Sequence, residues 1–373
     1  ISEEKKNISA ESRDYLLRQG ELIWKFFSEN INEKNNYLPP DNVQLDPAVG
    51  TAYRTSPTNI GFAILSCLGA ADLGITDEDT AFSYIEKMIN SVLSLEKYKG
   101  HLYNWYDTKT GHVMAPEYIS TVDSGNFQGA LIVLKSALLE KGRYDLLYKV
   151  EELMENMDFS FLYDKKANLY YIGYDKASGR QTENHYDLMS SEARQTSYIN
   201  VALGTAPKKH WRRLSRTLVS VDGYKGMVSW TGTMFEYLMP NLLLPWEKGS
   251  LAYESAWLCL YAQKKRTEGK CPWGISESCY FAFDRNSSYS YEAHGVQEIA
   301  LKRDMDKKLV ISPYSTFLAL SLDPEGAVKN LKDLEKLGAV GKYGFYEAVD
   351  FTGREKGTGG RVVKTFMAHH LGM

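Results

Sequence analysis

Apolar residues recur at helical spacing in successive segments of the chain, and these segments alternate in character. Residues 59–73 are apolar almost all round, which is typical of a buried helix, whereas residues 77–98 carry one apolar stripe, as an outer helix does. This alternation predicts an all-α toroid in which each helical hairpin buries one face against its neighbours. The predicted helices span residues 12–31, 59–73, 77–98, 123–139, 144–157, 183–204, 208–215, 230–238, 250–265, 313–322 and 324–337.

Three short segments depart from the helical pattern in the same way. Residues 102–111, 169–179 and 343–353 each consist of an aromatic-rich strand followed by an acidic turn that ends in glycine. We expect β-hairpins here, gathered on one rim of the helical barrel, where their aromatic side chains can line a cleft. No stretch is rich enough in Pro or Ser to be a linker, so residues 1–373 are predicted to form a single domain. A glycine-rich stretch at residues 356–361 follows no predicted strand and is interpreted as a mobile loop.

Charge and cysteine content exclude several classes of function. The net charge of −3 creates no strong field for nucleic acid or for an anionic membrane surface, and no apolar run is long enough to span a membrane. The 4 cysteines and 7 histidines show no ligand spacing, so we expect no metal site, no cofactor and no disulfide framework.

The informative bias is aromatic, with 26 Tyr, 14 Phe and 7 Trp in the chain. Many of these residues stand beside Asn, Asp, Gly or Arg instead of within apolar runs. Aromatic rings flanked by hydrogen-bonding groups suit a sugar, which offers a C–H face for stacking and a rim of hydroxyls. The alternative is that they cover a large helical surface.

Glu192 is the first candidate for chemistry. It lies in the predicted helix 183–204, for which Asp187 is a possible N-cap, and it interrupts a helix face that is otherwise apolar or uncharged. A surface acid paired with Arg194 or with another neighbour is one interpretation. A catalytic acid at the mouth of a helical barrel is the other.

Further carboxylates stand in unusual surroundings. Asp123 precedes a predicted inner helix and is either its N-cap or a site residue. Glu236 has apolar neighbours that would raise its pKa, and Glu277 follows a Trp-Gly pair. Two carboxylates across a sugar site are what glycoside chemistry needs, because one protonates the leaving oxygen and the other attacks the anomeric carbon or activates water.

The stretches of the chain that carry a family resemblance are residues 38–42, 54–61, 103–107, 120–126, 191–194, 229–240, 272–278, 343–348 and 367–370. Through them, residues 37–373 resemble the central transglycosylation domain of cyclic β-1,2-glucan synthases, a glycoamylase-like family related to endo-β-1,2-glucanases. The resemblance implies an (α/α)6 barrel, here excised from a larger membrane protein.

The same resemblance implies the roles of individual residues. Glu192 is expected to be the acid/base and Glu277 the nucleophile, with the reverse assignment open and Glu236 in reserve. Proton delivery through a substrate hydroxyl or a water is also open, because a β-1,2 linkage crowds the scissile bond. The substrate contacts are expected from Arg54, Asn59, Asn104, Trp105, Asp123, Asn126, Trp230, Tyr237 and Trp273.

The activity implied is anomer-retaining transfer on linear β-1,2-glucan, which closes the chain into a ring through a glycosyl-enzyme intermediate. The implied partners are β-1,2-glucan and the membrane glycosyltransferase and phosphorylase-like domains of the parent chain, with no nucleic acid. The domain would be soluble, at the cytoplasmic face of an inner-membrane protein. Two alternatives stay open: an inverting endo-β-1,2-glucanase, and a non-catalytic β-1,2-glucan-binding module.

Overall fold

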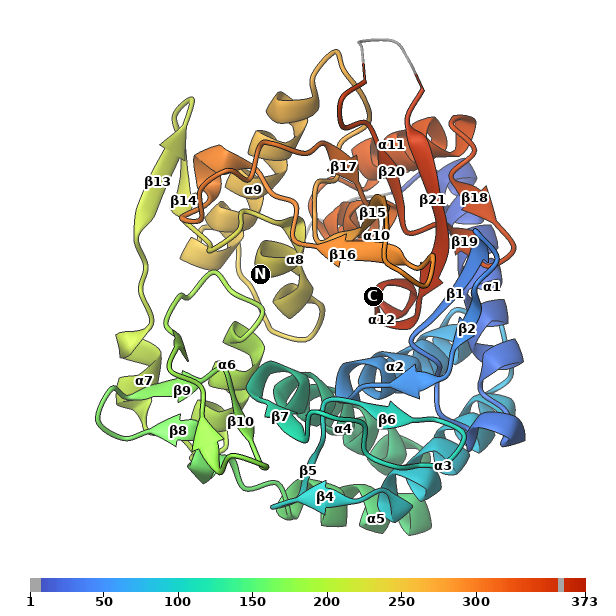
Figure 1. Cartoon of the computed structure of the whole chain (residues 1–373), viewed down its shortest axis with the longest axis vertical. Helices are drawn as coiled ribbons and strands as arrows, with labels where there is room; N and C mark the ends of the chain where they lie inside the picture. The colour runs from blue at the N-terminus through green and yellow to red at the C-terminus, as the bar shows by residue number, and fades with distance from the viewer. Residues whose placement is uncertain (1–7, 355–358) are drawn as a thin grey trace.

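The computed structural model describes residues 8–354 and 359–373 and shows a mostly helical fold with short strands (Figure 1). Of the glycine-rich stretch, residues 356–358 lie outside the described residues. The helices are α1 (Ala10–Asn30), α2 (Pro57–Asp72), α3 (Glu78–Ser94), α4 (Thr121–Lys141), α5 (Tyr144–Glu155), α6 (Arg194–Ala202), α7 (Lys208–Arg213), α8 (Met234–Leu238), α9 (Leu251–Thr267), α10 (Pro313–Leu318), α11 (Pro324–Lys336) and α12 (Ala368–Gly372).

The strands are short and pair antiparallel in several small sheets. They are β1 (Asn42–Asp46), β2 (Gly50–Ala52), β3 (Arg54–Thr55), β4 (Lys97–Tyr98), β5 (His101–Leu102), β6 (Tyr106–Asp107), β7 (Tyr118–Ser120), β8 (Tyr163–Asp164), β9 (Leu169–Tyr171), β10 (Gly173–Asp175), β11 (Arg180–Gln181), β12 (His185–Tyr186), β13 (Leu218–Val221), β14 (Tyr224–Met227), β15 (Ser278–Phe283), β16 (Tyr289–Glu292), β17 (Val310–Ile311), β18 (Val340–Gly341), β19 (Gly344–Phe345), β20 (Ala348–Asp350) and β21 (Arg361–Met367).

The even-numbered helices lie around the middle of the molecule in Figure 1 and contact one another in chain order. Helix α2 packs on α4, α4 on α6, α8 on α10, and α12 on α2. Arg194 of α6 donates a hydrogen bond to Asn241, just after α8 (2.7 Å), and the rings of Tyr314 on α10 and His370 on α12 stack at 3.7 Å. Helices α3, α5, α9 and α11 pack against these inner helices or one another from outside.

The apolar patterns explain which helices are inner and which are outer. In α2, buried residues occupy every face of the N-terminal half, from Pro57 to Ile64, because the helix packs against α3, α4 and α12. In α3 only one stripe is buried, and Asp77 caps its N-terminus by accepting a hydrogen bond from the Thr80 amide (2.8 Å). The predicted inner and outer characters of these two helices are confirmed.

Two predicted helices begin several residues later than expected. Helix α6 begins at Arg194 instead of residue 183, because Leu188 and Ser190 are held extended by bridges to Ser215 and Ser229. Asp187 is therefore not an N-cap. Helix α8 begins at Met234 instead of residue 230, since Thr233 and Glu236 close a capping box at that point. Hydrophobic spacing alone did not reveal either interruption.

The three aromatic segments form turns as predicted but do not share one sheet. Asp107 and Asp175 each accept hydrogen bonds from amides of the turn that follows, and Gly111 and Gly179 adopt positive φ there. Strand β6 pairs with β3 and β10 with β7 and β11, whereas β20 belongs to the sheet β17-β20-β21-β1-β2. Most of their aromatic rings are core residues instead of cleft residues, including Tyr103, Tyr106, Tyr170, Tyr343 and Phe345.

In the described part of the chain, no helix combines the length and the apolar character needed to cross a membrane.

The inner helices α4 and α6 approach each other closely at a glycine. A Cβ added to Gly125 of α4 would overlap Thr196 Oγ1 of α6 and would lie 2.6 Å from Thr196 Cβ. These two inner helices therefore meet at a distance that only glycine permits.

Replacing Gly125 by Ala is expected to destabilise the fold by about 1–3 kcal/mol, because the new methyl group forces α4 and α6 apart. The midpoint of urea unfolding, followed by circular dichroism, measures this loss. Gly69→Ala in α2 is the matched control, since a Cβ there meets nothing within 4 Å. That variant should be unchanged or up to about 1 kcal/mol more stable. Equal midpoints for the two variants would contradict the close-packing argument.

Candidate active site

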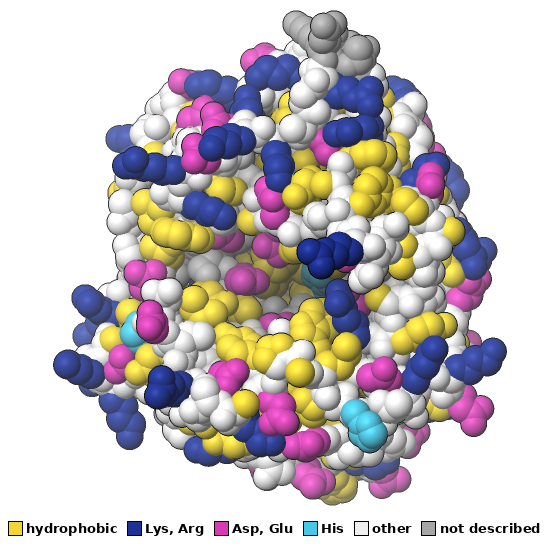
Figure 2. All heavy atoms as spheres, in the orientation of Figure 1, with side chains coloured by type: hydrophobic (Ala, Val, Ile, Leu, Met, Phe, Trp, Pro, Cys, Tyr) yellow, Lys and Arg dark blue, Asp and Glu magenta, His cyan; other side chains and the backbone are white. Residues whose placement is uncertain are grey.

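A cleft of about 590 Å³ opens on the face shown in Figure 2, where acidic side chains gather in a hollow near the middle of the molecule. It brings together Asp123, Glu192 and Glu277, which are far apart in sequence. Among the described residues that line it, Arg54 is the only Lys or Arg. The other predicted site residues in its wall are Arg54, Asn104, Trp105 and Asn126.

Asp123 is held by the N-terminal turns of two inner helices. Ser120 is the N-cap of α4 and accepts a hydrogen bond from the Asp123 amide (3.2 Å), so the N-cap interpretation of Asp123 is wrong. The Asp123 carboxylate accepts from Thr58 Oγ1 of α2 (2.6 Å). The Asn104 amide, oriented to satisfy its neighbours, donates to the other carboxylate oxygen (3.3 Å) and accepts from Trp105 Nε1 (3.1 Å). Asp123 is thereby fixed at the cleft wall.

A buried carboxylate that the sequence did not single out, Asp41, orders the neighbouring part of the cleft wall. Asp41 is 1% exposed and accepts from the Arg54 guanidinium (2.9 Å) and from Asn59 Nδ2 (3.1 Å). The Arg54 guanidinium in turn lies over the Trp105 ring, 4.7 Å from its centroid. Asn59 therefore acts behind the cleft wall, whereas Arg54 and Trp105 present a cation and an aromatic face to the cleft.

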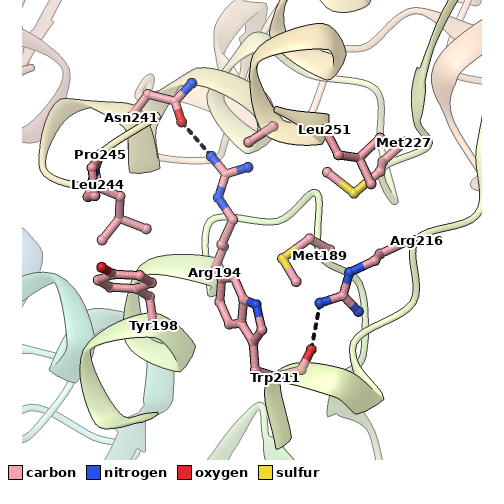
Figure 3. A pocket seen from close by; sticks show the side chains of 11 residues that line it. Met189, Arg194, Tyr198, Trp211, Arg216, Met227, Asn241, Leu244, Pro245 and Leu251 are labelled. Atoms are coloured by element: carbon pink, nitrogen blue, oxygen red, sulfur yellow. Dashed lines mark hydrogen bonds between the residues drawn. The ribbon is translucent and has the colours of Figure 1, made fainter. Parts of the chain in front are cut away.

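Glu192 lies in the turn immediately before α6, and Arg194 anchors this turn from behind. Figure 3 shows the Arg194 guanidinium in the wall of a second cavity of about 230 Å³, where it donates to Asn241 Oδ1 (2.7 Å). Burial lowers the pKa of Arg194 to about 10, so it stays cationic at neutral pH. In the same view Arg216 donates to the Trp211 carbonyl (2.7 Å). Arg194 thus does not pair with Glu192, which excludes an ion pair between these two residues.

The two central glutamates differ in their protonation. Burial raises the pKa of Glu192 well above its usual value, and the carboxylates of Glu277 and Asp123 raise it further. Burial raises the pKa of Glu277 to about 7, although a hydrogen bond from the Tyr291 hydroxyl (3.0 Å) works in the opposite direction. Near pH 7 the cleft therefore offers one carboxylic acid that can donate a proton and one group that is largely ionised above that pH.

Glu236, the reserve candidate for catalysis, has a structural role. Its carboxylate accepts hydrogen bonds from Ser229 Oγ (2.8 Å) and Thr231 Oγ1 (2.6 Å), and it closes the capping box with Thr233. It does not line the cleft. Its negative charge nevertheless contributes to the raised pKa of Glu277.

Three further predicted contacts lie outside the cleft wall. Tyr237 is 1% exposed, and its hydroxyl donates to the Met227 carbonyl (2.7 Å), so it belongs to the core. Trp273 is also buried, and its amide donates to Asn330 (3.0 Å). Trp230 is 55% exposed on the surface. Tryptophans beside glycine were expected to stack on sugars, but Trp273 packs within the core instead.

The structure adds groups that the sequence reasoning missed. Tyr291 and His369 line the cleft, and Glu347 pairs with His370 directly behind it (2.9 Å). No pattern in the sequence marked Tyr291 as a site residue. The two histidines and Glu347, in contrast, lie in the stretches 343–348 and 367–370 that carry the family resemblance. In residues 8–354 and 359–373, no three His, Cys, Asp or Glu side chains are arranged to hold a metal ion.

Comparisons with known proteins agree with this geometry. Residues 184–373 match the Glycoamylase family, described as "Putative glucoamylase". The chain is 30% identical, over 507 aligned positions, to the cyclic β-(1,2)-glucan synthase NdvB of Rhizobium meliloti (strain 1021), an alignment that covers 98% of this chain. That alignment covers 18% of NdvB, so the chain spans less than a fifth of the length of this relative.

Two solved structures are similar in fold. One is a "putative glucoamylase" from Bacteroides fragilis NCTC 9343, with TM-score 0.78, 17% identity and coverage of 100% of this chain and 91% of that chain. The other is the endo-β-1,2-glucanase from Chitinophaga pinensis in complex with sophorotriose and glucose, with TM-score 0.77, 15% identity and coverage of 98% and 91%. At these identities the likeness shows the fold alone.

Proposed function

The chain belongs to the Glycoamylase family, and from that premise we propose that it is a transglycosylase that retains anomeric configuration and closes linear β-1,2-glucan into rings. The observation that carries the proposal is the pairing, in one cleft, of Glu192 in its acid form with Glu277, whose pKa is about 7. The likeness to a cyclic β-(1,2)-glucan synthase supports the choice of glucan.

We also propose that the inner helices close into an (α/α)6 toroid around the cleft. The contacts from α2 through α4 to α6, from α8 to α10 and from α12 back to α2 support closure. The Arg194–Asn241 hydrogen bond and the stacking of Tyr314 on His370 join the remaining neighbours. In such a ring, the first turn of α4 and the turn that precedes α6 bring Asp123 and Glu192 to one end of the barrel.

In the first step a carboxylate oxygen of Glu277 attacks the anomeric carbon, and the bond from that carbon to the glycosidic oxygen breaks. The proton of Glu192 passes to the leaving oxygen, directly or through a substrate hydroxyl. In the second step Glu192 takes the proton of an acceptor hydroxyl, which attacks the anomeric carbon and releases Glu277. When that hydroxyl belongs to the same glucan, the product is a ring.

The remaining cleft residues position the sugar. Arg54 and Trp105 offer a charged donor above an aromatic face, and Asn104 and Asn126 offer amides beside Asp123. We further propose that the domain works as a soluble part of a longer inner-membrane protein, at its cytoplasmic face. There it would take glucan made by a glycosyltransferase domain of the same polypeptide and lie beside a phosphorylase-like domain.

The second candidate is an inverting endo-β-1,2-glucanase. Asp123 favours it, because a third carboxylate in the same cleft could activate a water molecule. The fold shared with the Chitinophaga pinensis endo-β-1,2-glucanase points in the same direction.

The test is incubation of the protein with linear β-1,2-glucan, followed by mass spectrometry and proton NMR of the anomeric signals. We expect products one water lighter than the linear chains with the same number of glucose units, formed with retention. Shorter linear chains with inverted new ends would identify the glucanase. Unchanged glucan that nevertheless binds to the protein would identify a binding module.

A further inference from the structure

A line of four polar side chains runs from the cleft into the protein. The Tyr291 hydroxyl lies 3.0 Å from Glu277 Oε1 and 3.5 Å from His370 Nε2, the longest of these contacts. His370 Nδ1 lies 2.9 Å and 3.0 Å from the two carboxylate oxygens of Glu347. Glu347 and His370 are each 4% exposed. A buried carboxyl group is thus connected to a cleft glutamate through two hydrogen-bonding rings.

The packing around the line fixes the inner pair, His370 and Glu347, whereas Tyr291 is 43% exposed at the cleft. Tyr314 stacks on the His370 ring at 3.7 Å with an interplanar angle of 9°, and its hydroxyl bonds to Ser276 Oγ (2.8 Å). The Cys279 amide donates to Glu347 Oε1 (3.2 Å), and Tyr291 stands opposite Cys279 in the β15–β16 pair. Neither His370 nor Glu347 can turn toward another partner without breaking these contacts.

The number of available protons decides the wiring of the line, by which we mean which atom donates each of its hydrogen bonds. Tyr291 has one O–H, and ionised Glu277 takes it. The Tyr291 oxygen then accepts a hydrogen bond from an N–H at His370 Nε2. A neutral imidazole protonated at Nε2 leaves Nδ1 as an acceptor, so the hydrogen between His370 and Glu347 comes from Glu347. In the opposite arrangement, two acceptors compete for the single Tyr291 proton.

We propose that Glu347 is a protonated carboxyl group that, through His370 and Tyr291, keeps a hydrogen-bond donor on Glu277. The importance for catalysis rests on the proposed function, because that function makes Glu277 the nucleophile. Glu347 and His370 are then positioning residues, since neither touches the substrate. The line holds the attacking carboxylate in one orientation and stabilises its ionised form.

The charges around the line agree with this wiring. Asp41 and His369 act electrostatically on Glu347, while Asp123, Glu192, Glu236 and an ionised Glu347 act on Glu277. Burial raises the pKa of Glu347 to about 8 and lowers the pKa of His370 to about 3. An ionised Glu347 would add a buried negative charge beside neutral histidines, which is costly.

Nitrogen-15 NMR of histidine-labelled protein tests the wiring without any substrate. The chain has 7 histidines, and comparison with His370→Gln or Glu347→Gln assigns the His370 signals. We expect His370 to carry its proton on Nε2 at pH 7 and to switch to Nδ1 as the pH rises through about 8. In Glu347→Gln, whose amide also donates, the switch should be absent. A proton on Nδ1 at pH 7 would overturn the proposal.

The pKa of Glu277, followed by carbon-13 NMR of labelled glutamate, tests whether the line reaches the cleft. Tyr291→Phe removes the donor and should raise this pKa by about one unit. Glu347→Leu should raise it in the same direction, whereas Glu347→Gln should leave it in place. The matched control is Glu292→Gln, a carboxylate paired with Lys308 outside the line.

A response to Tyr291→Phe but not to Glu347→Leu would end the line at Tyr291 and overturn the proposal. Equal responses to Glu347→Leu and Glu347→Gln would indicate only a packing role and would also overturn it. Neither NMR measurement needs turnover. A protein that leaves β-1,2-glucan unchanged but gives the expected spectra would contradict the proposed function while leaving the wiring of Glu347 in place.

Discussion

Replacing Glu277 by Gln is expected to lower the rate of ring formation from linear β-1,2-glucan by about 10⁴-fold. The amide has almost the same shape but cannot attack the anomeric carbon, and loss of an attacking group usually costs factors of this size. Mass spectrometry of the ring product over time measures the effect. Circular dichroism should show that the fold is unchanged, and Glu292→Gln is the matched control for loss of one carboxylate elsewhere.

Added azide then shows whether Glu277 is the nucleophile or the acid/base. In Glu277→Gly the azide ion fits the space of the missing carboxylate and attacks from the same side, so it should form a glycosyl azide with inverted configuration. A glycosyl azide with retained configuration would exchange the roles of Glu277 and Glu192. A Glu277→Gln variant with native rate would remove Glu277 from the chemistry and return attention to Asp123 and Glu236.

Replacing Glu192 by Gln is expected to lower the same rate by about 10²–10⁴-fold, the usual contribution of a general acid. The loss should be much smaller on a β-glucoside with a phenol leaving group, since such a group departs without a proton. Initial rates on the two substrates measure the difference. An equal loss on both would contradict the acid role.

The pH profile of the native protein follows from the same two groups. Its rate should rise as the pH increases through about 7, where Glu277 ionises, and fall at higher pH, where Glu192 loses the proton that its raised pKa retains. In Glu192→Gln the alkaline fall should disappear while the rise near pH 7 stays. A profile that keeps both limbs would assign the alkaline limb to another group.

The helices with strong local signals were predictable from the sequence. In α2 and α3 the apolar pattern and the starting positions agree with the structure to within two residues, whereas α3 ends at Ser94, four residues before the predicted end. The prediction over residues 183–204 failed because Leu188 and Ser190 bridge to Ser215 and Ser229. Those partners are remote in sequence, and a pairing of this kind leaves no mark on local hydrophobic spacing.

In the candidate site, too, local signals were predictable from the sequence and contacts between remote segments were not. Asp123, Glu192 and Glu277 were found because carboxylates in motif-like surroundings are visible in a sequence, and the structure places all three at one cleft. The pairing of Asp41 with Arg54 and that of Glu347 with His370 were not foreseen. Each depends on two segments meeting in space, and a carboxylate read alone does not reveal its partner.

The pairing of β1 with β21 has a consequence for the order in which the protein forms. These strands join residues near the beginning of the chain to residues near its end, with Val43 opposite Phe366, and Gln44 and Thr365 both line the cleft. Contacts so distant in sequence form late in folding. During synthesis β1 must wait for β21 to leave the ribosome, so one wall of the cleft is completed last. A nascent chain that still lacks residues 361–367 thus holds its carboxylates in an unfinished cleft, and catalytic competence appears only once β21 has paired with β1.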